Sequence, residues 1–178
     1  MSDPLSPRAS ARARVVFDTF RSRHDPLLAA WLSFRAQVLP GAELPPAGPV
    51  RSVDGPAVGG VFGVWRLLAS NNRELARGAD LSASPDRARA AVELAQTRFV
   101  ELAPATVRGT SAMRHGWSLR LDGEPVLMCA RWYESPGEAA AAARSVRTVL
   151  AGADIALSVT IGTRSGRRHR HGALDLVG

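Results

Sequence analysis

Lysine is absent from the sequence and cysteine occurs once. All 23 basic residues are arginines, and we attribute this to the base composition of the genome because alanine is also abundant. The single Cys129 excludes an internal disulfide and a cysteine-rich zinc site. No secretory apolar region follows Met1, so we expect a cytoplasmic protein.

Long apolar runs and aromatic side chains are also scarce. No uncharged apolar run approaches the roughly 20 residues that a membrane helix needs, so we expect no membrane association. Hydrophobic residues make up 46% of the 178 residues but aromatic residues only 6%, so the core must consist of small side chains around a few tryptophans and phenylalanines. This length accommodates one ordinary domain with extensions.

Positive charge is concentrated at the two ends of the chain. The formal net charge is +7, of which residues 1–23 and residues 164–178 each contribute +3 and the rest +1. Any function of the basic charge therefore belongs to the ends.

Between Trp65 and Leu150 the chain contains one pattern twice. Each copy has a strand that starts at a tryptophan, a polar turn, a second apolar strand, a Ser-Pro pair and an alanine-rich segment. Trp65 and Trp117 are 52 residues apart, and Pro85 and Pro136 are 51 apart. A fixed spacing of this kind indicates an internal duplication.

The turns and helix starts of the two copies have local chemical signals. Asp122 with Gly123 predicts a type I′ hairpin turn, in which both residues have positive φ, and Asn71 with Asn72 is the weaker equivalent. Ser84 and Ser135 each precede a proline, as expected for a cap and the first helical residue. Ser135 and Glu138 also form a capping box. Each helix carries a matching apolar stripe: Ala88, Ala91, Val92, Ala95 and Phe99, and Ala139, Ala142, Ala143, Val146 and Leu150.

The arrangement resembles the YegP-like family of tandem-repeat domains. Tyr133, Glu134 and Ser135 match its Tyr-x-Ser motif, while residues 81–84 match loosely and each turn matches half of an Asn-Gly pair. The resemblance covers roughly residues 60–162. It implies an antiparallel sheet formed by both copies, with helices on one side and terminal strands exchanged between the copies. It implies no activity and no catalytic residues.

We therefore expect an α+β fold in which two ββα-type repeats share one antiparallel sheet, after an N-terminal helical extension. The predicted divisions are an arm and amphipathic helix (1–40), a Pro/Gly linker (41–60), the tandem-repeat domain (61–162, with repeats 61–103 and 115–162) and a flexible basic tail (163–178). Within the repeats, residues 98–103 and 153–162 are predicted strands, and residues 104–116 a loop.

Helical signals run through residues 11–39. Asp25 and Pro26 predict a helix start, after which apolar residues recur at intervals of three and four. This stripe either packs on the repeat domain or contacts a protein partner or a second copy of the chain. Under the second alternative, the contact residues are Leu27, Trp31 and Phe34.

The sequence contains no convincing catalytic or metal-binding constellation. His115 with Cys129 could form a thiolate pair, but a cysteine in an apolar strand is usually packed and inert. His169 and His171 have no other ligand nearby, so a solvated basic arm is the simpler interpretation. We expect no enzyme, no metal and no cofactor.

Nucleic acid or another polyanion is the expected ligand. Four phosphate contacts by Arg164, Arg167, Arg168 and Arg170 would give a salt slope of about −3.6. The sheet aromatics Trp65, Trp117, Trp132 and Tyr133 could stack bases, although the two alternating tryptophans favour a core position. The predicted function is a non-enzymatic binding module that uses its basic ends for RNA or DNA; the alternative is an assembly module that uses the N-terminal helix.

Overall fold

The structure, a computed structural model, describes residues 12–20, 24–44, 61–82 and 84–161. Its strands form one seven-stranded sheet in the order β4-β5-β6-β3-β2-β1-β7. The strands are β1 Arg14–Phe20, β2 Val61–Leu68, β3 Glu74–Gly78, β4 Ala103–Arg108, β5 His115–Leu121, β6 Glu124–Cys129 and β7 Asp154–Ile161. The predicted α+β class is confirmed.

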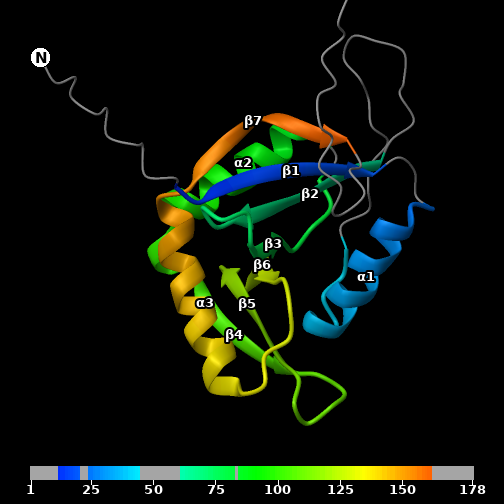
Figure 1. Cartoon of the computed structure of the whole chain (residues 1–178), viewed down its shortest axis with the longest axis vertical. Coiled ribbons are helices and arrows are strands. Elements are labelled where there is room, and N and C mark those ends of the chain that lie inside the picture. Colours follow the sequence, from blue (N-terminus) through cyan, green and yellow to red (C-terminus); the bar gives the residue numbers. More distant parts are fainter. Residues whose placement is uncertain (1–11, 21–23, 45–60, 83, 162–178) are drawn as a thin grey trace, which may run out of the picture.

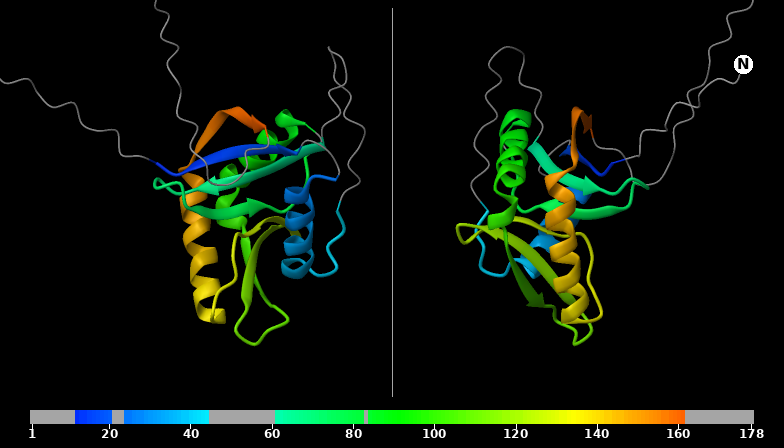
Figure 2. Two further views of the ribbon diagram at one scale, coloured as in Figure 1. Left: turned by 45° about the vertical axis from the view of Figure 1, so that its right-hand side comes forward. Right: turned by 90° about the vertical axis from the view of Figure 1, so that its left-hand side faces the viewer.

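Neighbouring strands are antiparallel except for β1 and β7 at one edge, which are parallel. The helices are α1 Pro26–Val38, α2 Pro85–Thr97 and α3 Pro136–Ala151, and a short 3-10 helix, η1, spans Phe99–Glu101. Figures 1 and 2 show α1 on the side of the sheet away from α3. The sheet therefore has helices on both sides.

Side chains at the predicted N-caps start all three helices. The Oγ atoms of Ser84 and Ser135 each accept a hydrogen bond of 3.2 Å from the backbone N–H three residues later. Asp25 accepts from the N–H of Leu27 at 2.9 Å. The Glu138 carboxylate accepts from the N–H of Glu134 instead of the N–H of Ser135, so the predicted capping box is displaced by one residue.

The two hairpin turns differ in length. Asp122 and Gly123 have φ angles of 51° and 86°, which confirms the predicted type I′ turn. In the first hairpin only Asn72 has a positive φ, 65°. Because the Ala69 N–H donates to the Arg73 carbonyl at 2.8 Å, the turn closes around the three polar residues 70–72, one more than in the second hairpin, and Asn71 lacks the positive φ expected of it.

Small side chains allow the helices and strands to pack closely around the two buried tryptophans. Trp65 is 3% exposed and Trp117 is fully buried. A Cβ atom at Gly78 would lie 2.6 Å from the Trp65 Nε1 atom, so the indole requires a glycine on the neighbouring strand. Most of the predicted helical stripes are buried, but Ala91 is exposed and Phe99 lies in η1.

Residues 14–20 form strand β1, so the helical interpretation of this segment is wrong. The strand pairs with β2 on one side and β7 on the other. Val15, Phe17 and Phe20 are buried in the core. Pairing with two strands satisfies the backbone of β1 from both sides, and this tertiary contact outweighs the weak local helical signal.

The segment after α2 also differs from the prediction. The predicted strand at residues 98–103 consists mainly of η1, and β4 occupies the beginning of the predicted loop. β4 is an edge strand whose side chains are mostly exposed, so it lacks the apolar alternation of a half-buried strand. The strand predicted at residues 153–162 is confirmed as β7.

Candidate functional site

The arginines predicted to bind nucleic acid, Arg164, Arg167, Arg168 and Arg170, lie outside the described residues. The end of β7 nevertheless limits where this segment starts, because Ile161 is the register partner of Thr19 at the end of β1. Arg164 is three residues beyond Ile161, and Arg21 is two residues beyond Thr19.

Two basic segments that are far apart in sequence therefore follow two strand ends, those of β1 and β7, that pair with each other. No acidic residue occurs between Thr19 and His24, or between Ile161 and Gly172. The parallel β1–β7 pairing is the feature that brings the two segments together, and the helical interpretation of residues 14–20 concealed it.

Most of the surface predicted for a protein partner is used within the chain. Trp31 is 4% exposed. The rings of Phe34 and Trp132 are 5.5 Å apart at 60°. The Arg77 guanidinium lies 5.5 Å from the centre of the Phe34 ring. Among these three residues only Leu27, which is 45% exposed, remains available, so the contacts of Trp31 and Phe34 favour the first alternative, in which the stripe packs on the repeat domain.

Arg35 fastens α1 to the sheet. This residue is 3% exposed, and it donates to the carbonyl oxygens of Ala79 at 2.5 Å and Ala42 at 2.9 Å. Its ion pair with Asp80 has a length of 3.2 Å. Burial raises the pKa of Asp80, and this effect outweighs the opposing attraction of Arg35. A charged residue within the apolar stripe of the helix was the sequence signal for this contact.

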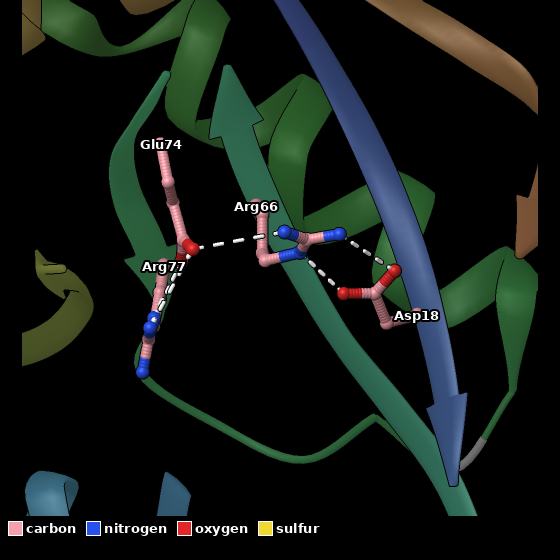
Figure 3. A network of polar contacts seen from close by, with 4 residues as sticks. All are labelled: Asp18, Arg66, Glu74 and Arg77. Atoms are coloured by element: carbon pink, nitrogen blue, oxygen red, sulfur yellow. Dashed lines mark hydrogen bonds and ion pairs between the residues drawn. The ribbon is translucent and has the colours of Figure 1, made fainter. Parts of the chain in front are cut away.

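A second polar network crosses strands β1, β2 and β3 (Figure 3). Arg66 forms ion pairs with Asp18 and Glu74, and Glu74 also binds Arg77. Burial acts to lower the pKa of Arg66, but its contacts with both carboxylates outweigh burial and raise it. Two arginines and two carboxylates balance one another, so this network holds the strands together and leaves no excess charge for a ligand.

The burial of Trp65 and Trp117 confirms the core position that their alternation favoured over base stacking. Trp132 packs against Phe34, and a Cβ atom at Gly116 would lie 3.1 Å from its ring. Among the four aromatic residues considered for stacking, this leaves Tyr133, which is half-buried and has Arg131 at 5.0 Å from its ring centre.

Cys129 has the properties of a packed thiol. It is fully buried, and its sulfur accepts a hydrogen bond of 3.4 Å from the backbone N–H of Trp117. Burial raises the pKa of the thiol, which is the reverse of the shift that a nucleophilic cysteine needs. The geometry therefore favours an inert Cys129 over a thiolate paired with His115.

The described residues contain neither a cluster of metal-binding side chains nor a helix suited to a membrane. Groups of three or more His, Cys, Asp or Glu side chains arranged to hold a metal ion are absent from this part of the chain. None of its helices has the length and apolar character required to cross a membrane.

Neither a protein-family model nor a curated protein matches this chain. The fold is similar to the solution NMR structure of YegP from E. coli, a protein of unknown function. The TM-score is 0.44 at 12% sequence identity, and the match covers 85% of this chain and 97% of YegP.

Proposed function

We propose that this chain is a non-enzymatic module that binds nucleic acid or a related polyanion through the arginines at its ends. The pairing of Thr19 with Ile161 carries the proposal, because six arginines follow these two residues and the next carboxylates, Asp25 and Asp175, come only after them. They are Arg21, Arg23, Arg164, Arg167, Arg168 and Arg170. Arginines whose segments follow two paired strand ends can contact successive phosphates of one nucleic-acid strand.

The ion pairs of the described body support this assignment. Arg98 binds Glu101 and Asp122, and these bonds lower the pKa of both carboxylates. Arg35, Arg66 and Arg77 have carboxylate partners as well. Four described arginines, Arg35, Arg66, Arg77 and Arg98, are therefore paired with carboxylates, whereas the ends carry most of the formal charge.

The proposal includes an internal duplication of residues 61–103 and 115–162. Three relationships support it: both copies have a strand hairpin followed by a serine-capped helix, both first strands bury a tryptophan, and β4, which follows the first copy, pairs with β5 of the second. The equivalent exchange would pair β7 with β2. β1 lies between those two strands, so the N-terminal strand is an insertion that brings both basic segments to one edge.

The alternative function, an assembly module, has less support because Trp31 and Phe34 pack inside the chain. A cytoplasmic location stays a prediction from the sequence.

The test is a binding titration that compares the full chain with a variant whose four tail arginines, Arg164, Arg167, Arg168 and Arg170, are replaced by serine. Single-stranded RNA, duplex DNA and inorganic polyphosphate serve as probes at fixed salt. We expect the variant to bind all three more weakly. The matched control replaces one exposed helix arginine, Arg144→Ser, and should bind like the unaltered chain. Equal binding by the tail variant and the unaltered chain would refute the proposal.

A further inference from the structure

At the edge formed by β4 and β5, three chain segments place their side chains in one row. Arg108 of β4 is the register partner of His115 in β5. His115 and Tyr133 exchange backbone hydrogen bonds of 2.9 and 2.8 Å. Residues directly opposite each other in antiparallel pairs point to the same face of a sheet, so Arg108, His115 and Tyr133 form a continuous row.

This row combines aromatic and basic character at the surface. Tyr133 and His115 are half-buried, which fixes the rings and leaves part of each accessible. The Arg131 guanidinium lies over the Tyr133 ring at 5.0 Å from its centre. Arg108 and Arg131 are exposed. We call these four residues (Arg108, His115, Arg131 and Tyr133) the Tyr133 patch.

The arginines of the Tyr133 patch have no carboxylate partner within the described part of the chain. Arg108 and Arg131 form no ion pair there, in contrast to Arg66 and Arg98. The carboxylates next along the chain, Glu134 and Glu138, lie at the start of α3, where Glu138 binds the N–H of Glu134. The patch therefore presents uncompensated positive charge beside an aromatic ring.

We propose that the Tyr133 patch is a stacking site for a base of single-stranded nucleic acid, with Arg108 placed to meet an adjacent phosphate. The inference rests on the proposed function and adds to it the class of ligand and a second contact. Aromatic and guanidinium planes bind bases by stacking, largely regardless of base identity. In a duplex both faces of each base are already stacked, so a single strand is the form that fits.

The patch lies far from the paired ends of β1 and β7, which the end arginines follow in the sequence. β4 and β7 are the two edges of the sheet, six strand spacings apart, which corresponds to roughly 29 Å. Figure 1 shows the β4–β5 connection at the bottom of the molecule and β1 and β7 at the top. A strand that touches both places must cross the sheet, so the two contacts can be removed separately.

The test measures the affinity of the full chain for two probes. One is an oligouridylate of about 16 nucleotides, a length within the roughly 4–16 nucleotides of known single-strand sites. The other is an abasic phosphodiester of the same length. Tyr133→Ala should weaken oligouridylate binding by about 5- to 150-fold, the loss typical of one base–aromatic stack. Affinity for the abasic probe should stay within twofold of the unaltered chain. Tyr133→Phe keeps the ring and should restore binding. Tyr133→Leu keeps apolar volume without an aromatic face, so it should behave like Tyr133→Ala even if the alanine variant folds poorly.

The controls separate this inference from the proposed function. Arg144→Gln alters an exposed arginine of α3 and should change neither affinity. The serine variant of the four tail arginines should lose affinity for both probes; if it loses none while Tyr133→Ala is base-selective, the end arginines fail as a site and the patch stands. Equal effects of Tyr133→Ala on both probes, or no effect on either, would overturn the stacking site. Tighter binding of polyglutamate that depends on Arg131 and is indifferent to Tyr133 would overturn it in favour of an acidic protein.

Discussion

The Nε atom of Arg35 donates a hydrogen bond of 2.5 Å to the carbonyl oxygen of Ala79, which joins helix α1 to the chain that leaves strand β3. Arg35 comes from a segment that precedes the repeated region, and Ala79 lies within the first repeat. The contact is buried, so its removal leaves backbone carbonyls without a donor.

We expect Arg35→Met to lower the free energy of unfolding by about 2–4 kcal/mol, since methionine fills the space but donates no hydrogen bond. Urea unfolding followed by circular dichroism measures the change. The matched control is Arg144→Met on the exposed face of α3, for which we expect a change below about 0.5 kcal/mol. Similar losses in the two variants would show that Arg35 does not hold α1 on the sheet.

Gly78 and Gly137 should respond to alanine in opposite directions. At Gly78 a Cβ atom would lie 2.6 Å from the Trp65 indole nitrogen, so Gly78→Ala should destabilise the protein by about 1–3 kcal/mol. At Gly137, in the first turn of α3, the nearest atom is 3.9 Å away. Gly137→Ala should stabilise the protein by up to about 1 kcal/mol, because alanine favours helix. Thermal unfolding of both variants decides, and a stabilising Gly78→Ala would contradict the packing of Trp65.

Cys129 should make stability depend on pH above the ordinary range of a thiol. Burial raises its pKa, so the native chain retains the thiol proton at pH values where the unfolded chain has released it. The free energy of unfolding therefore falls as pH rises above about 8.5. Cys129→Ala removes this contribution, and the stability difference between the unaltered chain and the variant should shrink between pH 8 and pH 10. A constant difference across that range would argue against a buried thiol.

The elements predicted well are those encoded by neighbouring residues. Ser84 and Ser135 cap helices through hydrogen bonds that span three residues, and Asp122 with Gly123 sets a turn through its own φ angles. Such signals survive in any tertiary context, so the sequence suffices to locate them.

Strand β1 could not be predicted in the same way, because its partners are remote. Val15 pairs with Leu67 and Ile155, which lie 52 and 140 residues further along the chain. Val15, Val16 and Phe17 are consecutive and apolar, so they do not distinguish the helical period from that of a strand. Only the assembled sheet decides between them.

The Tyr133 patch and the polar network around Arg66 escaped prediction for a related reason. Tyr133 was one of the four aromatic residues predicted to be able to stack bases, but Arg108 belonged to a predicted loop and its pairing with His115 was not expected. Likewise, Asp18 and Glu74 meet at Arg66 only because β1 and β3 both pair with β2. Register between distant strands determines both groups of side chains.

The salt dependence of duplex DNA binding tests the central claim most directly, because it counts phosphate contacts. If the six arginines that follow Thr19 and Ile161 all contact phosphates, the slope of log K against log salt should be about −5.4 for the full chain. Replacement of the four tail arginines by serine should reduce it to about −1.8, and further replacement of Arg21 and Arg23 should bring it close to zero. The same slope for the full chain and the four-serine variant would contradict the assignment of polyanion binding to the paired ends of β1 and β7.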